Sequence, residues 1–215
     1  MIANPSHDLK QPGASRDTIL EVAEELLAAN GYAGTSISMI CRRAGLPASS
    51  VYWHFGSKER ILDEVLERVT ERVLASVPRA ELGSARPQQR IEELLLACIA
   101  EPGSERAVAF RLLTLVGFER GHARGRSFTP PVRRLRRELL LAWKSVFSQF
   151  DLGVPDAEAD AAAETLARFA VAAVDGISFA LQVDPELEAS ELVRMAAAAF
   201  NALAIVSLSE SNDAA

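Results

Sequence analysis

The sequence predicts an all-α protein of about nine helices, and three observations support this. Alanine, leucine and glutamate abound, and these residues lose little side-chain freedom in a helix, whereas aromatic residues make up only 6% of the 215 residues. Apolar residues recur at spacings of three and four along most of the chain. No segment of useful length alternates apolar and polar residues, as a half-buried strand would.

The N-terminal quarter of the chain contains the clearest helix boundaries. We expect residues 1–14, a polar segment with two prolines, to form a disordered arm. A first helix should begin near Ser15 as its N-cap and end at Asn30-Gly31, where Gly31 supplies the left-handed conformation. Two short helices should follow over about 36–44, capped by Thr35 or Ser36, and about 48–55.

A longer fourth helix should begin after the cap Ser57 and end at Pro78. We therefore expect one domain over residues 15–78 and a second over 79–210, joined by a polar linker at 79–88. The helices predicted for the second domain lie between proline and glycine breaks, at about 89–101, 105–119, 129–150, 156–182 and 190–208.

Composition limits the location of the chain and its classes of partner. With 49% hydrophobic residues it can bury a substantial core, yet no run approaches the roughly 20 uninterrupted apolar residues of a membrane span. The N-terminus lacks the apolar segment of a secretory signal, so we expect a cytoplasmic protein without a membrane partner. Cys41 and Cys98 lie on apolar helical stripes, which favours reduced, buried thiols over a disulfide and leaves a redox role open.

The charge distribution is uneven. The chain has a net charge of −6, but residues 32–60 contain four basic residues (Arg42, Arg43, Lys58 and Arg60) against the single acidic Glu59. A small positive face on an acidic body is compatible with contact to a polyanion such as DNA, because local neutralisation of phosphates supplies the attraction.

The most specific pattern lies at residues 35–58, which read TSISMICRRAGLPASSVYWHFGSK. With the helix before it, this segment resembles the DNA-binding domain of the TetR family of one-component transcriptional regulators (TetR/AcrR type). The match covers about 50 residues, and a dozen positions of unlike chemistry coincide in register. The resemblance implies a helix-turn-helix whose second helix, at 48–55, lies in the major groove of DNA.

The resemblance also implies roles for individual residues. The first exposed turn of the recognition helix should reach base edges, and it consists of Ala48, Ser49 and Ser50. Candidates for phosphate contacts are Ser36, Tyr52, His54 and Lys58, while Trp53 suits packing and contact with the groove edge. Other interpretations stay open: a simple cap for Ser36, a core residue for Tyr52, and a solvated side chain for His54, Arg42 and Arg43.

Two positions depart from the family pattern. Ser38, which we also expect at the DNA interface, stands where the family often has an arginine that contacts a base, and Pro47 stands where a serine N-cap is common. Neither replacement can make the same polar contact to DNA. Phosphate contacts and groove shape should therefore contribute much of the affinity.

For the second domain the resemblance implies a small-molecule effector and a homodimer. The segments LARFAVAAVDGISFALQV and VRMAAAAFNALAIV are apolar nearly all round, so something must bury them, either a second copy or the monomer's own core. Asp175 could serve the pocket or the dimer seam. The candidate pocket residues, which imply a largely apolar effector, are Phe110, Leu113, Phe118, Trp143, Phe147, Phe169, Asp175, Ile177 and Phe179.

The sequence contains no glycine-rich phosphate loop, metal-spaced His/Cys set or G-x-S-x-G motif, so we expect no enzyme, catalytic residue, metal or cofactor. The expected function is a repressor that leaves a palindromic double-stranded DNA operator when the effector binds. The alternative is a helical scaffold or partner-binding protein that retains the fold without binding DNA, and the serine at position 38 is its support.

Overall fold

The computed structural model describes residues 12–78, 86–116, 129–150 and 155–210, and these ranges contain nine α-helices, one π-helical segment and no strand. The all-α prediction is therefore confirmed. In chain order the N-terminal elements are α1 (Pro12–Gly34), α2 (Ile37–Ala44), α3 (Ala48–Phe55) and α4 (Lys58–Ser76). The later elements are α5 (Pro87–Cys98), α6 (Glu105–Arg111), η1 (Leu112–Val116), α8 (Pro130–Phe147), α9 (Asp156–Val183) and α10 (Ala189–Glu210).

Several helix boundaries differ from those expected. α1 begins at Pro12, within the segment assigned to the arm, because proline suits a first helical position; Ser15 is buried in the helix and does not cap it. α5 likewise begins at a proline, Pro87, and the Gln89 side chain accepts a hydrogen bond from the Arg86 N–H (3.3 Å). Residues 1–11 and 79–85 lie outside the described residues.

Glycine and threonine explain two local breaks. Gly31 has the expected positive φ of 70°, but its ψ of −180° lies outside the left-handed helical region, and helical residues resume up to Gly34. The helix expected over 105–119 is α-helical only to Arg111 and then becomes the π-helical η1. There the Thr114 hydroxyl donates to the Phe110 carbonyl, which is a local alternative to regular helix hydrogen bonds.

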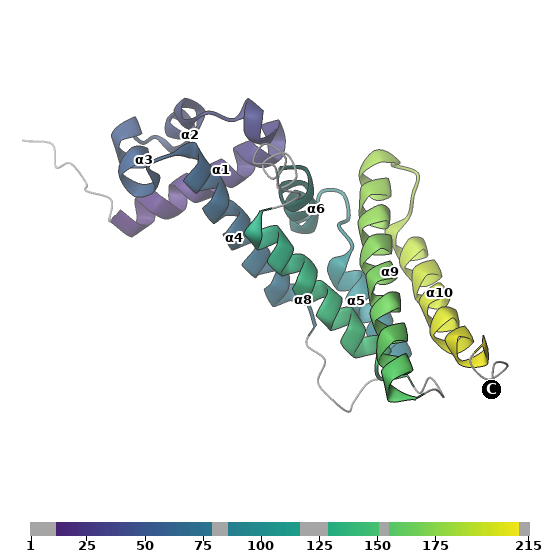
Figure 1. The fold of residues 1–215 in the computed structure, drawn as a ribbon. Helices are drawn as coiled ribbons and strands as arrows, with labels where there is room; N and C mark the ends of the chain where they lie inside the picture. Colours follow the sequence, from purple (N-terminus) through teal and green to yellow (C-terminus); the bar gives the residue numbers. More distant parts are fainter. Residues whose placement is uncertain (1–11, 79–85, 117–128, 151–154, 211–215) are drawn as a thin grey trace, which may run out of the picture.

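The molecule is elongated, with α1–α3 at one end, α9 and α10 at the other, and α4 and α8 running between them (Figure 1). Its apolar side chains form two clusters. The first cluster joins α1–α4 to α6, η1 and the beginning of α8, and the second joins α5, the end of α8, α9 and α10. The division of the chain into domains at residues 78 and 79 stays a prediction, because the first cluster extends across it.

Ion pairs tie the first cluster together at the surface. Arg72 of α4 donates two hydrogen bonds to the Glu24 carboxylate of α1, at 2.9 and 2.8 Å. Arg134 of α8 pairs with Glu67 of α4 at 2.7 Å. Each pair is at least partly exposed, so each contributes about 1 kcal/mol at most and mainly fixes the relative position of the helices.

α9 is the described helix that is long and apolar enough to cross a membrane, judged by length and composition alone. Charged residues interrupt its apolar sequence, among them Arg168 and Asp175. One side of α9 packs on α8 and α10, as in the core of a helical protein. Its other side reaches the surface and is described below.

Candidate functional site

The turn between α2 and α3 is fixed by backbone chemistry that the sequence makes available. Ser36 caps α2 and its hydroxyl oxygen accepts a hydrogen bond from the Met39 N–H (3.3 Å). Gly45 ends α2 in the left-handed conformation (φ 65°, ψ 30°), which a residue with a side chain adopts only with strain. Ile40, Val51 and Phe55 are at most 2% exposed and pack these two short helices onto α1 and α4.

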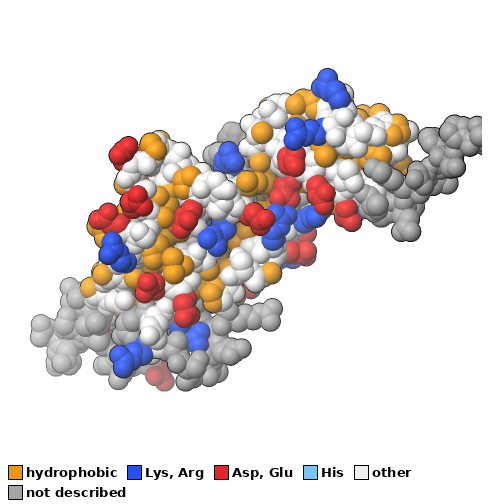
Figure 2. All heavy atoms as spheres, turned by 180° about the vertical axis from the view of Figure 1, so that it is seen from behind, with side chains coloured by type: hydrophobic (Ala, Val, Ile, Leu, Met, Phe, Trp, Pro, Cys, Tyr) orange, Lys and Arg blue, Asp and Glu red, His pale blue; other side chains and the backbone are white. Residues whose placement is uncertain are grey.

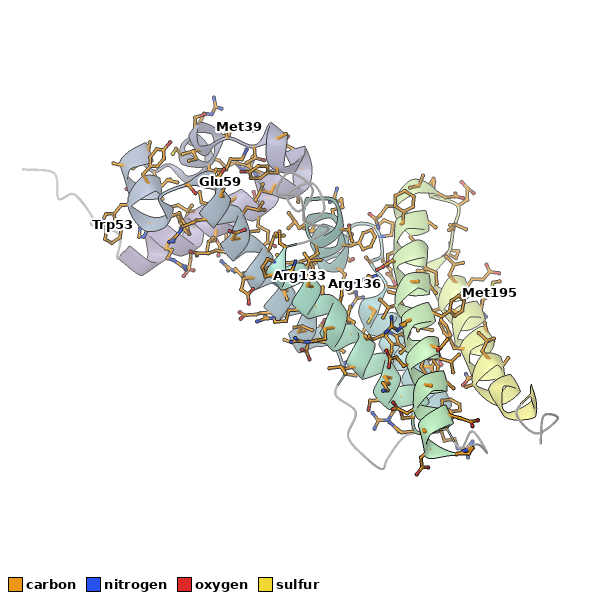
Figure 3. The ribbon with its side chains drawn as sticks, in the orientation of Figure 1. Met39, Trp53, Glu59, Arg133, Arg136 and Met195 are labelled. Atoms are coloured by element: carbon orange, nitrogen blue, oxygen red, sulfur yellow. The ribbon has the colours of Figure 1, made fainter. Side chains whose placement is uncertain are left out.

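Because Val51 and Phe55 face inward, the opposite side of α3 faces outward. Ala48 and Ser49 of the first turn of α3 are exposed, Tyr52 is 54% exposed and Trp53 is 74% exposed. Figure 3 shows Trp53 projecting away from the ribbon at this end of the molecule. We call these four residues, Ala48, Ser49, Tyr52 and Trp53, the outer face of α3.

His54 and Ser50 border the outer face of α3 and are half-buried. The His54 ring meets the edge of the Trp53 ring, with centroids 4.6 Å apart, so the two rings support each other. A shallow hollow runs from Tyr52 past His54 to Arg60 of α4. Arg60 was not among the expected site residues. Its position in the first turn of the helix after α3, three residues beyond the N-cap Ser57, could have indicated that it lies beside α3.

Lys58, at the start of α4, is held in a defined position. Its ammonium lies 4.0 Å from the centroid of the Tyr32 ring, a cation–π contact, and the Tyr32 hydroxyl donates to Glu59 Oε1 (2.8 Å). Lys58 is half-buried and lies beside α3 in the chain. The contacts of Tyr32 could not be expected from the sequence, because its partners Lys58 and Glu59 are 26 and 27 residues away in the chain.

Ser36 and Ser38 lie at the start of α2, with their hydroxyl oxygens 2.9 Å apart. The oxygen of Ser36 serves as the helix cap, which confirms the cap interpretation. Arg42 and Arg43 are exposed at the end of α2, and Arg43 pairs with Glu25 (2.8 Å). All nine residues expected at a DNA interface thus lie on α2, α3, their caps and the first residue of α4.

A second feature is a cavity of about 140 Å³ where α4, α5, α6, η1, α8 and α9 meet. Its walls come from both apolar clusters, so it lies at the seam between them, and we call it the central cavity. The apolar walls include Val73, Ala109, Leu113, Val132, Leu135 and Val174. The polar or ionisable groups that face it come from Cys98, Arg106, Thr114, Arg136, Asp175 and Ser178.

Three of the expected pocket residues, Phe110, Leu113 and Asp175, line the central cavity. Trp143 and Phe147 do not: they are at most 1% exposed and pack against each other and Phe200 in the second cluster, with ring centroids 5.8–6.0 Å apart. These three rings fill the core of the second cluster and do not line the central cavity. Ile177 is half-buried against the same cluster.

Phe169 and Phe179 are also absent from the walls of the central cavity, because they lie on the outer side of α9. They are 52% and 59% exposed. Phe118 lies outside the described residues.

Among the polar groups of the central cavity, Asp175 forms an ion pair with Arg136, which lies between α8 and α9 in Figure 3. The Ser178 hydroxyl oxygen accepts from the Ala100 N–H (3.1 Å). Burial raises the pKa of the Cys98 thiol, which is about 12 once the opposing effect of the Arg106 charge and the smaller raising effect of Asp175 are included. Cys98 is thus a protonated, unreactive thiol at neutral pH.

Arg106 of α6 is the remaining charged group. Its Nε atom is buried and has no hydrogen-bond partner in the described part of the chain. Arg106 and Arg136 were not among the expected pocket residues, although both share helical spacing with apolar residues. Arg106 precedes Ala109, Phe110 and Leu113 by three, four and seven positions, which places a cation on an apolar stripe.

Within the described ranges no group of three or more His, Cys, Asp or Glu side chains could hold a metal ion. The structure offers two surfaces: an outward face with hydroxyl, aromatic and basic groups on α2–α4, and a partly open, mostly apolar cavity with charged groups between the two clusters.

Comparison with known proteins agrees with the local geometry. Residues 19–65, from α1 to α4, match the family model of "Bacterial regulatory proteins, tetR family". The HTH-type transcriptional regulator LmrA of Bacillus subtilis is 32% identical over 89 residues, which are 40% of this chain and 47% of that protein. The match thus spans about half the length of that relative.

This chain matches a larger share of a second relative. The "uncharacterized HTH-type transcriptional regulator TtgW" of Pseudomonas putida is 30% identical over 92 residues, which are 42% of this chain and 67% of that protein. A protein of Saccharomonospora viridis solved in complex with choline shares the fold, with a TM-score of 0.61, 22% identity, and coverage of 86% of this chain and 94% of that chain. From the family model and these relatives, we conclude that the chain belongs to the tetR family of bacterial regulatory proteins.

Proposed function

We propose that the protein is a ligand-responsive transcriptional regulator that acts in the cytoplasm, binds a palindromic operator as a homodimer and releases it when a small molecule enters the central cavity. The observation that carries this proposal is the outer face of α3. Two bulky aromatic residues, Tyr52 and Trp53, stand in solvent beside the small residues Ala48 and Ser49, on a helix whose other side is fully packed. Such exposure costs free energy unless the side chains have a partner.

The dimensions and chemistry of α3 suit the major groove. Small residues in its first turn allow the helix to approach base edges, while Tyr52 and His54 offer hydrogen bonds to the backbone. Lys58, held over Tyr32, adds a cation beside them without having to be ordered on binding. Because the first turn offers no bidentate base contact, much of the affinity should come from phosphates and groove shape.

A homodimer is supported by the outer side of α9. Phe169, Ala172, Gly176, Phe179 and Val183 are all exposed and are spaced by three and four residues, and we call them the α9 stripe. Met195, Ala199 and Ala202 continue an exposed apolar surface on α10 at the same spacing. This is the pattern by which helices pack side by side, and a twofold copy would bury both surfaces in a four-helix interface.

The effector response is supported by the position of α4. This helix begins at Lys58, directly after α3, and Val73 near its other end lines the central cavity. A ligand that prefers one position of α4 changes the spacing of the two recognition helices, and a preference of about 1–3 kcal/mol changes operator affinity about 5–150-fold. A structural neighbour with choline bound is compatible with a ligand site in this fold.

The test is fluorescence anisotropy with a labelled DNA fragment from upstream of the protein's own gene, over a series of salt concentrations. Trp53→Ala should weaken binding about tenfold or more, because it removes a large exposed contact. Leu141→Ala, at an exposed leucine on α8 remote from α3, is the matched control and should leave binding unchanged. Lys58→Gln should flatten the salt dependence by about one counterion.

Failure of the wild-type protein to bind the fragment at low salt would contradict the proposal and favour the scaffold alternative. Equal weakening by Trp53→Ala and Leu141→Ala would also contradict it, because the DNA would then not contact α3.

A further inference from the structure

The central cavity contains an unequal number of charges. Arg106 and Arg136 bring two guanidinium groups to its wall, and Asp175 is the carboxylate among its lining residues. Asp175 and Arg136 form an ion pair. One positive charge, that of Arg106, is therefore left in excess against mostly apolar walls.

The unpaired state of Arg106 stands out among the arginines with buried nitrogens. Arg68, Arg90 and Arg134 also have a buried side-chain nitrogen without a partner, but Arg68 and Arg134 pair with carboxylates through other atoms, and Arg90 is engaged elsewhere. Arg106 has neither an ion pair nor a hydrogen bond within the described residues. A buried guanidinium N–H without an acceptor is costly, so its natural complement is an anion.

The other polar groups do not compete for that anion. The Thr114 hydroxyl donates to the Phe110 carbonyl, and Cys98 is a protonated thiol. The Ser178 oxygen accepts from Ala100, which leaves the hydroxyl hydrogen of Ser178 able to donate to a ligand. A cationic ligand, by contrast, would have to displace Arg136 from Asp175 and approach Arg106.

Size limits the apolar part of the ligand. The central cavity, at about 140 Å³, resembles the engineered apolar cavities of about 150 Å³ that hold benzene. A single ring or a short aliphatic chain therefore matches the volume of the central cavity.

From these observations we infer that the effector is a small monocarboxylate with a compact apolar body, whose carboxylate pairs with Arg106. Arg106 is then the residue that selects the ligand by charge, and the apolar walls select it by size. This inference rests on the proposed function for the role of the central cavity as an effector site, but the binding itself does not depend on DNA.

The test uses isothermal titration calorimetry on the full chain without DNA, with three probes that share one ring: benzoate, benzyl alcohol and benzyltrimethylammonium. Benzoate should bind at least tenfold more tightly than the other two. Arg106→Gln should remove that preference, weakening benzoate at least tenfold while benzyl alcohol changes less than about threefold. Arg111→Gln, at an exposed arginine of the same helix, is the matched control and should bind like the wild type.

A folding defect is recognised separately, because Arg106→Gln without ligand should unfold at a temperature no lower than that of Arg111→Gln. Arg106→Lys should restore part of the benzoate preference, since it returns the charge without the planar donor geometry. The inference is overturned if benzoate fails to bind at millimolar concentration, if benzyl alcohol or the cation binds as well, or if benzoate binding survives Arg106→Gln.

The outcomes separate this inference from the proposed function. A wild-type protein that binds DNA but shows no preference for benzoate over the other two probes overturns the inference alone. Arg106-dependent benzoate binding by a protein that binds no DNA overturns the proposed function alone.

Discussion

The two apolar clusters of this molecule differ in how completely they are covered at the surface. The first cluster is closed: its core residues are buried, and ion pairs such as Arg72–Glu24 and Arg134–Glu67 cover its surface. The second cluster is open on one side, where the α9 stripe leaves Phe169, Phe179 and Val183 more than half exposed. Figure 2 likewise shows apolar side chains at the surface of the body that carries the C-terminal helices.

This difference suggests a division of labour. A closed cluster holds the outer face of α3 rigidly, as recognition of DNA requires, whereas an open cluster suits burial by a second copy. The central cavity lies between the two, so a ligand there contacts both at once. Four predictions test this contrast, from the largest expected effect to the smallest.

The closed cluster predicts very different losses of stability at Trp53 and Phe55, which lie two residues apart in the same short helix. Phe55→Ala should lower the free energy of unfolding by about 3–5 kcal/mol, because Phe55 is 2% exposed and fills the core between α1 and α4. Trp53→Ala should change it by less than about 0.5 kcal/mol, since Trp53 is 74% exposed. Urea denaturation monitored by circular dichroism measures both, and similar losses would show that α3 does not have this orientation.

The open cluster predicts a mutation that affects association without affecting the fold. Phe179→Glu should weaken dimerisation on the order of a hundredfold, because it removes about 1.5–3 kcal/mol of apolar burial per copy and adds a charge at the interface. Sedimentation velocity over a concentration series gives the dissociation constant. Leu141→Glu, at an exposed leucine of α8 outside the α9 stripe, serves as control, and equal weakening by both would contradict the assignment.

The burial of Cys98 beside the central cavity predicts a loss of stability at alkaline pH. Burial raises the pKa of Cys98 from 9.0 to about 12, so above pH 9 the unfolded chain loses a thiol proton that the folded chain keeps. The free energy of unfolding should then fall by up to about 1.4 kcal/mol per pH unit between these two values, and it should be unaffected by this thiol below pH 9. Chemical denaturation at several pH values compares wild type with Cys98→Ala, in which this contribution should vanish; identical slopes would place Cys98 in solvent.

The smallest effect is expected at the start of α2. Ser36→Ala should cost about 1 kcal/mol of stability, because the Met39 N–H loses its acceptor, while Ser38→Ala should cost less because Ser38 caps nothing. Thermal unfolding measures the two. The opposite order would mean that the cap is not at Ser36.

The α2–α3 turn could be predicted from the sequence, whereas contacts between helices that are distant in the chain could not. Local signals such as the Ser36 cap, Gly45, and Val51 and Phe55 four residues apart specify the α2–α3 turn within about twenty residues, and the structure agrees with them. The expected nine-residue DNA interface is gathered on those elements, although contact with DNA stays a prediction. The role of Tyr32 could not be predicted, because its contact with Lys58 depends on how α1 packs beside α4.

Most of the expected pocket residues do not line the central cavity, because a cavity is made by helices that meet from distant parts of the chain. Aromatic residues were favoured as walls, yet Trp143 and Phe147 fill the second core and Phe169 and Phe179 lie outside. Periodicity shows that a residue faces inward, but not whether space remains beside it. The more informative signal was a charge on an apolar stripe, which Arg106, Arg136 and Asp175 all show.

The central claim is that two copies present their α3 helices to successive turns of one DNA face. A spin label at Ser49→Cys, in a chain whose Cys41 and Cys98 are replaced by alanine, reports the distance between the two outer faces in a pulsed dipolar measurement on the protein without ligand or DNA. We expect one narrow distance close to the 34–36 Å repeat of the double helix, about 35 Å. A monomer without dipolar coupling, or a distance far from one helical turn, would contradict the account.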